Sequence, residues 1–138
     1  MSEPYLLLVN GGRDFRDYAK LTEEIMKLHD NELMEREVSI VSGMAGGADR
    51  LAYNFCTEHQ VKCHEMPADW SNLDVEGAVI KYNKWGQPYN VLAGHMRNTE
   101  MAAISHGLLS FWDGRSTGTK DMIDKMRTQN KQVRIIHY

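Results

Sequence analysis

Residues 42–52 read SGMAGGADRLA and directly follow the apolar run VSIV. A turn this rich in glycine lets backbone N–H groups approach another group closely, and a helix starting there adds a partial positive charge. The stretch is therefore suited to holding an anion such as a phosphate, with Ser42 as a hydroxyl donor beside Gly43, Gly46 and Gly47. The spacing matches neither GxGxxG nor GxxxxGK[ST], so it indicates neither a dinucleotide fingerprint nor a P-loop. The alternative is a tight turn whose small residues let a helix pack against a sheet.

Two more stretches combine glycine with polar side chains. NGGRDF, residues 10–15, places Arg13 directly after two glycines, and an arginine offers a planar fork of donors to a phosphate or carboxylate. Alternatively, Arg13 pairs with Asp14 or with solvent while Phe15 packs in the core. DGRSTGT, residues 113–119, has three hydroxyl side chains before a predicted helix. Its alternative interpretation is a simple N-cap by Thr117 or Thr119.

A fourth stretch, AGHMRNTEM at residues 93–101, carries Arg97, Asn98 and Glu100 at or near the start of a predicted helix. Arg97 could complete an anion site, and Glu100 has the reach for a sugar hydroxyl or an anomeric carbon. The alternative is that both residues lie on a solvated helix face. The histidines and the two cysteines, Cys56 and Cys63, lack metal-ligand spacing, so we expect no metal site and no disulfide framework.

The elements that position these residues follow from hydrophobic patterning. Four short apolar runs predict buried strands at 5–9, 38–42, 108–112 and 133–137, and a weaker fifth lies at 61–66. Apolar residues at helical spacing lie between them, around 21–28, 51–56 and 122–126. This alternation predicts an α/β fold: one mostly parallel, five-stranded or slightly larger sheet with helices on both faces. Such sheets bind ligands at the carboxyl ends of their strands, where the polar stretches follow the first, second and fourth strands.

Length and charge limit the classes of function. A chain of 138 residues fits one domain, residues 1–138. Its net charge of −3 offers no basic field for a nucleic-acid backbone, so nucleic-acid binding is disfavoured. No stretch approaches the about 20 apolar residues of a membrane span, and the first residues lack a signal-peptide pattern, so we expect a cytoplasmic protein without membrane contact.

The segment 67–93 has the least regular pattern and holds two of the three tryptophans. We expect a loop with at most one helical turn that covers the ligand edge of the sheet or contacts another subunit. The aromatic residues at 70–89 make a homodimer or a larger homo-oligomer the expected assembly.

Five motifs in order, GGRDF, SGMAGGADRLA, PADW, AGHMRNTEM and FWDGRSTGTKDMI, resemble the YspA-like (cpYpsA-related) family of the SLOG superfamily, whose relatives include the DprA/Smf proteins and the Lonely Guy phosphoribohydrolases. The resemblance covers residues 5–137. It implies a Rossmann-like sheet that binds a nucleotide-derived ligand at glycine-rich strand ends, and it places an arginine of functional importance at Arg97. No cofactor is required, although Mg²⁺ can accompany a phosphate ligand. The expected ligand-binding positions are Gly11, Gly12, Arg13, Asp14, Ser42, Gly43, Met44, Gly46, Gly47, Asp49, Arg97, Asn98, Asp113, Ser116, Gly118 and Thr119.

One departure from the family pattern concerns catalysis. The Lonely Guy enzymes carry a glutamate in PGGxGTxxE, and this sequence has Met122 at the corresponding position. Asp121 precedes it by one residue, which on a helix is a rotation of about 100° away from the expected site. Hydrolysis by that mechanism is therefore doubtful, and Glu100, Asp14 or Asp49 would have to supply a carboxylate. Asp49 could equally be a helix-capping residue.

Three functions remain open at this point. The first is a binding module that senses or sequesters an ADP-ribose-like or cyclic nucleotide signal, including in defence against phage, in a bacterial cell or, if phage-encoded, in its host. The second is an enzyme that cleaves or exchanges an N-glycosidic bond, a phosphoribohydrolase or a deoxyribosyltransferase, with Glu100 and Arg97 as catalytic residues. The third, a DNA-binding module like DprA, is disfavoured by the acidic charge.

Overall fold

A five-stranded parallel sheet forms the centre of the protein. The computed structural model describes residues 3–33 and 36–138. The sheet has the strand order β3-β2-β1-β6-β7, and every neighbouring pair is parallel. Its strands are β1 (Tyr5–Gly11), β2 (Val38–Ser42), β3 (Cys63–Glu65), β6 (Gly107–Trp112) and β7 (Gln132–His137). All five strands expected from the apolar runs are present, and the predicted α/β class is confirmed.

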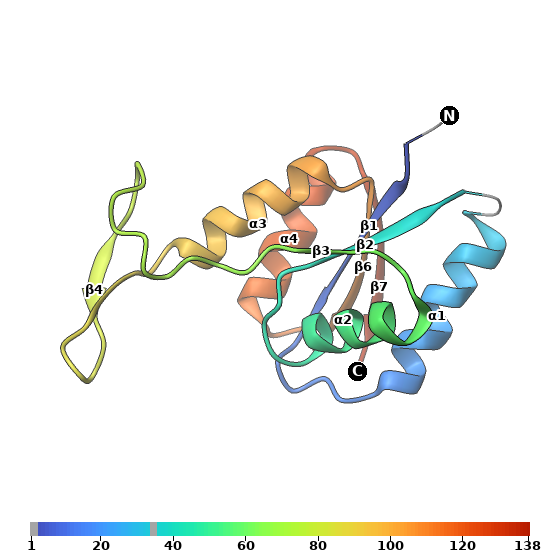
Figure 1. Ribbon diagram of the computed structural model, residues 1–138, viewed down its shortest axis with the longest axis horizontal. Helices are drawn as coiled ribbons and strands as arrows, with labels where there is room; N and C mark the ends of the chain where they lie inside the picture. Colours follow the sequence, from blue (N-terminus) through green and yellow to red (C-terminus); the bar gives the residue numbers. More distant parts are fainter. Residues whose placement is uncertain (1–2, 34–35) are drawn as a thin grey trace.

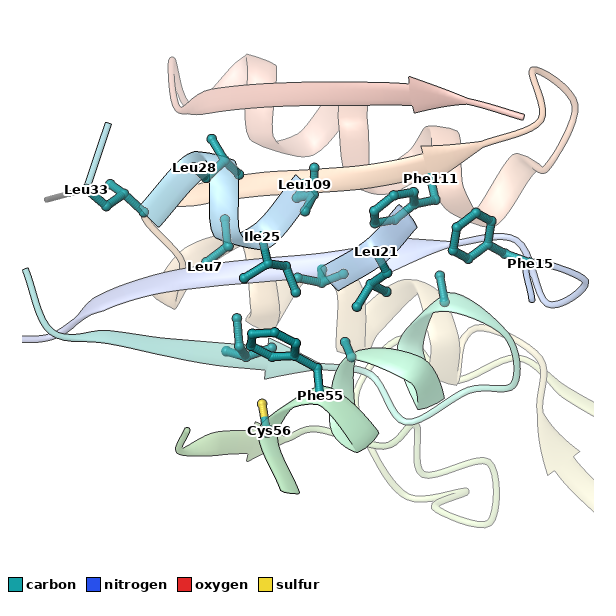
Figure 2. Packing of buried hydrophobic residues seen from close by; sticks show 14 residues of the cluster. Leu7, Phe15, Leu21, Ile25, Leu28, Leu33, Phe55, Cys56, Leu109 and Phe111 are labelled. Atoms are coloured by element: carbon teal, nitrogen blue, oxygen red, sulfur yellow. The ribbon is translucent and has the colours of Figure 1, made fainter. Parts of the chain in front are cut away.

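Four helices cover the two faces of this sheet (Figure 1). They are α1 (Tyr18–Asn31), α2 (Ala48–His59), α3 (Ala93–Ile104) and α4 (Thr117–Thr128). Helices α1 and α2 pack on one face, where side chains such as Leu7, Ile40 and Phe111 form a core (Figure 2). Helices α3 and α4 pack on the other face around Leu8 and Met122. Alternate strand residues point to opposite faces, so both faces of each central strand are apolar.

The order of the strands creates a switch point beside β1. The chain runs from β1 outward through β2 to β3 on one side, then returns to place β6 on the other side of β1. The loops after β1 and β6 therefore leave the sheet towards opposite faces. A crevice outside the carboxyl ends of these strands is where ligands bind in doubly wound sheets.

The segment 67–93 differs from its prediction as a loop with at most one helical turn. It contains an antiparallel hairpin of β4 (Ile80–Tyr82) and β5 (Pro88–Asn90), which we call the hairpin arm (residues 80–90). Its strands are too short to show an alternating pattern, which is why the sequence did not reveal them. Figure 1 shows the arm projecting away from the sheet and its helices.

Within residues 3–33 and 36–138, no helix is both long enough and apolar enough to cross a membrane.

Candidate functional site

The loop after β1 presents Arg13 at the carboxyl edge of the sheet. Phe15, two residues later, is buried and stacks on Phe111 of β6, with ring centroids 4.6 Å apart. The backbone carbonyl of Gly12 accepts hydrogen bonds from the N–H groups of Phe15 and Ala48, each at 3.2 Å. Arg13 itself is exposed, and its guanidinium forms no ion pair with any residue that the structure describes. The loop is thus held from both sides while its arginine stays free.

The glycines after β2 serve two different purposes. Gly47 has φ +74°, and a Cβ atom there would lie 2.1 Å from the carbonyl oxygen of Gly12, so this glycine lets the two loops touch. A Cβ at Gly43 would lie 2.6 Å from Nη1 of Arg97. Gly46, in contrast, is exposed, and no atom lies within 4 Å of the Cβ position there. Gly43 and Gly47 are therefore packing glycines, whereas Gly46 faces open space.

Ser42 does not present its hydroxyl to a ligand in this structure. The side chain is fully buried, donates to the backbone carbonyl of Asp49 at 2.8 Å, and accepts from the N–H of Met44 at 3.1 Å. These bonds explain how Met44 keeps a positive φ of 61°, a conformation that non-glycine residues rarely adopt. The Ser42 hydroxyl therefore uses its hydrogen and one lone pair to shape the loop.

Arg97 reaches this loop from the opposite face of the sheet. It lies in the second turn of α3 rather than at the helix start, and its Nη1 donates to the carbonyls of Gly43 at 2.6 Å and Met66 at 3.2 Å. Its Nε donates to Oδ1 of Asn98 at 3.0 Å. The guanidinium is thereby fixed at the carboxyl ends of β2 and β3, close to Arg13.

Asp49 is a buried carboxylate beside these arginines. It lies in the first turn of α2, only 6% exposed, and accepts a hydrogen bond from the N–H of Ala45 at 3.4 Å. Burial raises the pKa of Asp49 to about 6, even though the positive charges of Arg97 and Arg13 and the Ala45 bond act in the opposite direction. Burial also lowers the pKa of Arg97, which Asp49 partly offsets. The site therefore holds two cations and one carboxyl group that titrates near neutrality.

The loop after β6 uses most of its polar groups internally. Oδ1 of Asp113 accepts from the N–H groups of Arg115 and Ser116, each at 2.8 Å, and these bonds lower the pKa of Asp113. Ser116 is the N-cap of α4, and both the N–H and the hydroxyl of Thr119 donate to its Oγ. The capping interpretation holds for these residues, although Ser116 and not a threonine is the cap. Gly118, the second residue of α4, is exposed and lines one of the cavities described next.

Two adjoining cavities share Arg13, Trp70 and Arg97 as lining residues, and together we call them the groove. The smaller, of about 200 Å³, is lined by the loop after β2, including Gly43, Met44 and Gly46. The larger, of about 610 Å³, lies between α3 and α4. Its remaining lining residues are Val91, Gly94, His95, Asn98, Thr117, Gly118, Lys120, Asp121 and Asp124. Each of these two cavities contains residues from three of the predicted stretches.

The expectation that Asp121 is rotated away from the site is wrong. Met122 is fully buried in the core between α4 and the sheet, which turns the preceding Asp121 towards the larger cavity. Oδ2 of Asp121 accepts from Nδ2 of Asn98 at 3.1 Å, and Oδ1 accepts from Lys125 and lies 3.3 Å from Nδ1 of His95. The carboxylate is oriented by three neighbours while it lines the groove.

Besides Ser42, Gly47, Asp49, Asp113, Ser116 and Thr119, described above, four more predicted residues do not line the groove. Glu100 is exposed on α3, and it lines neither cavity. Asp14 points towards the end of the chain, where it accepts a hydrogen bond from the Tyr138 hydroxyl. Gly11 and Gly12 pack against Phe111 and Tyr138, respectively, which leaves no room for a side chain.

Sequence reasoning also missed polar residues at the switch point. Asn10 of β1 is the register partner of Ser110 of β6, and both side chains are buried. Neither Oδ1 of Asn10 nor Oγ of Ser110 has a hydrogen-bond partner. Buried polar atoms nearly always form hydrogen bonds. Asn10 and Ser110 are therefore unusual, because each has a buried side-chain oxygen without a partner at the switch point of the sheet. Ser110 lies inside the apolar run 108–112, and Asn10 begins the NGGRDF stretch, in which the glycines and Arg13 carry the distinctive chemistry, so neither side chain was predicted to matter.

Among residues 3–33 and 36–138, no cluster of three or more His, Cys, Asp or Glu side chains is arranged to hold a metal ion.

Fold and site together define a Rossmann-like α/β protein with a groove at the carboxyl edge of its sheet. Residues 6–72 match the profile of the YspA, cpYpsA-related SLOG family. The match includes Arg13, the loop after β2 and Trp70. It ends before Arg97, so the role of α3 and α4 rests on the structure.

Among solved structures, the chain is similar to DNA processing protein A (DprA) from Streptococcus pneumoniae, with a TM-score of 0.67 and 22% sequence identity. The similarity covers 98% of this chain and 50% of that chain, so this protein spans half the length of the solved one. At this identity the likeness establishes the fold alone, and it confirms the Rossmann-like architecture. A search of curated protein sequences finds no match for the chain.

Proposed function

We propose that this protein binds a nucleotide-derived phosphate ligand in the groove. The observation that carries the proposal is the convergence of Arg13 and Arg97 on both cavities, beside the exposed Gly46. Arg97 is held in place by two backbone carbonyls, so it is oriented before a ligand arrives. Ligand pockets of about 300–1,000 Å³ are typical of small-molecule sites, and the larger cavity falls in that range.

The ligand we propose is an ADP-ribose-like molecule or a cyclic nucleotide, which the protein senses or sequesters in the cytoplasm, including in defence between phage and host. Two observations favour binding over chemistry. Met122 stands in the core where a catalytic glutamate would be expected, and Glu100 lies outside the groove. No cofactor belongs to this proposal, apart from Mg²⁺ accompanying the phosphates of the ligand.

The test compares the binding of ADP-ribose, AMP and cyclic AMP by isothermal titration calorimetry, each with and without Mg²⁺. We expect Arg13→Ala to weaken binding about tenfold or more, since a hydrogen bond to a charged group contributes about 1.5–3 kcal/mol. Arg13 is exposed, so this variant should melt like the wild type. Arg97→Ala should weaken binding and also lower the Tm, because the carbonyls of Gly43 and Met66 lose their donor. Unchanged affinity in both variants would contradict the proposal.

A second candidate, cleavage of an N-glycosidic bond, is favoured by Asp121, which lines the larger cavity. In this reaction the bond between the sugar C1′ and the base nitrogen breaks and the hydroxyl of water adds to C1′. The remaining proton of water goes to the departing adenine of AMP, or to solvent when NAD releases neutral nicotinamide. The Asp121 carboxylate would stabilise the positive charge that develops at C1′. Release of free base from NAD or AMP, abolished by Asp121→Asn and retained by Glu100→Gln, would establish this function. Intact nucleotide after prolonged incubation would rule it out for these substrates.

We further propose that the protein forms a homo-oligomer through the hairpin arm. Trp85 and Tyr82 on the arm are 74% and 68% exposed, and an isolated two-stranded hairpin is only marginally stable in water. A second copy covering these aromatic rings would bury apolar area that the monomer leaves in water.

A further inference from the structure

Trp70 stands where the two cavities of the groove meet. It lines both of them together with Arg13 and Arg97, and its side chain is 42% exposed. A tryptophan left partly in water keeps apolar area exposed that a core position would bury. Within residues 3–33 and 36–138, no aromatic ring stacks on Trp70 and no cationic side chain lies over it. The indole ring therefore has a face available at the centre of the proposed site.

The position of Trp70 is built into the fold from two sides. Its backbone carbonyl accepts a hydrogen bond from the N–H of Asn90 at 2.8 Å. Asn90 is itself almost fully buried, and its Oδ1 accepts from the N–H groups of Val79 and Leu92 at 3.2 and 3.1 Å. The base of the hairpin arm thus anchors the segment that carries Trp70.

Helix α3 packs against the indole ring of Trp70. A Cβ atom at Gly94 would lie 3.2 Å from Cη2 and 3.5 Å from Cζ2 of Trp70, so the indole lies against the helix backbone. Any larger residue at this position would have to displace the ring. Because Gly94 has no side chain, the indole of Trp70 packs directly against α3. The exposed part of the ring lines the groove.

We infer that Trp70 is the stacking platform for the base of the ligand, so that the groove selects phosphorylated ligands that carry an aromatic base over base-free sugar phosphates. The inference deepens the proposed function and rests on it. Base–aromatic stacking contributes about 1–3 kcal/mol per base and tolerates any base. The phosphate lies with Arg13 and Arg97, and the base lies on the indole of Trp70. The carboxylates of Asp121 and Asp124, in the same cavity, accept hydrogen bonds from the sugar hydroxyls or an exocyclic amine.

The experiment measures binding of AMP and of ribose 5-phosphate, which differ only by the base, to the full chain. Wild type should bind AMP more tightly. Trp70→Ala should weaken AMP binding about 5- to 100-fold and leave ribose 5-phosphate binding within about twofold. Trp70→Phe retains a stacking ring, so it should keep AMP affinity within a few-fold of wild type. Trp85→Ala, a matched change of an exposed tryptophan on the hairpin arm, should leave the affinity for both AMP and ribose 5-phosphate unchanged.

Tryptophan fluorescence adds a readout that a purely structural role would not change. AMP should quench the emission of wild type and of Trp85→Phe, and the quenching should disappear in Trp70→Phe even though that variant still binds. Equal weakening of AMP and ribose 5-phosphate by Trp70→Ala, or no effect on either, would overturn the inference while the proposed function stands. If neither AMP nor ribose 5-phosphate binds the wild type, phosphate binding in the groove fails, and the inference fails with it.

Discussion

At the scale of single residues, Asp49 sets an unusual charge balance beside two arginines. Its folded-state pKa of about 6 lies above the ordinary value of 3.8, because burial outweighs the attraction of Arg97 and Arg13. A carboxyl group with a raised pKa binds its proton more tightly in the folded state than in the unfolded one. Its contribution to stability is therefore fully present below about pH 4 and is lost as the pH rises through about 6.

The same titration should control ligand affinity. Below about pH 6 Asp49 is neutral and the net positive charge of the arginines acts on the ligand, whereas above it the carboxylate repels the ligand phosphates. We expect the affinity for ADP-ribose, whose diphosphate does not titrate in this range, to fall about threefold to tenfold between pH 5 and pH 8. Calorimetry of Asp49→Asn, which keeps an acceptor for the N–H of Ala45, should show tighter binding at pH 8 and little pH dependence. The same slope in both proteins would exclude Asp49 as its source.

At the scale of elements, the site depends on contact between the loops after β1 and β2. Gly47 touches Gly12, whose carbonyl also accepts from the first N–H of α2. The loop that carries Arg13 is therefore packed against the start of the helix that carries Asp49. Arg97 of α3 donates to the Gly43 carbonyl in the loop after β2, so the contact between the two loops also keeps Arg13 close to Arg97.

This contact predicts different outcomes for two neighbouring glycines. Gly47→Ala should cost at least about 2 kcal/mol, because it combines a positive φ with a collision against the Gly12 carbonyl. Thermal denaturation should show this as a Tm lower by roughly 5–10 °C. Gly46→Ala is the control: its Cβ meets no atom, so the free energy of unfolding should change by less than about 0.5 kcal/mol. Equal melting of the two variants would mean that the loop contact does not matter for stability.

At the scale of the whole molecule, the hairpin arm is the part that forms a separate sheet, outside the central sheet and its helices. It projects away from the core (Figure 1). Its exposed aromatic side chains include Tyr82 and Trp85. We expect light scattering to report a dimer or larger assembly for the wild type, and the double variant Tyr82→Ala, Trp85→Ala to shift it towards a monomer. The variant should keep its Tm at high dilution, because neither ring packs in the core. A monomeric wild type at about 100 μM, well above the Kd that a functional assembly needs, would refute assembly through the arm.

Sequence and structure agree most closely in the sheet. The five strands and helices α1, α2 and α4 follow from local patterning, because a buried strand or an amphipathic helix needs apolar residues at fixed intervals whatever surrounds it. Helix α3 was predicted without such an apolar pattern. The glycine-rich loops and Arg13 were predicted as part of the site, since glycine and arginine have distinctive local chemistry. Arg97 was predicted there too, although its place in the second turn of α3 was not.

The sequence by itself determined the α/β class, the glycine-rich strand ends and the candidate arginines, because these depend on residue type and short-range spacing. Only the tertiary structure decided which polar groups are free and which are already used. Ser42, Asp14 and Ser116 bond within the protein, while Asp121 and Trp70 line the groove. The direction of Asp121 depends on how α4 packs against the sheet, and the position of Trp70 depends on the hydrogen bond between its backbone and Asn90. Those contacts join residues far apart in the chain, and no local pattern encodes them.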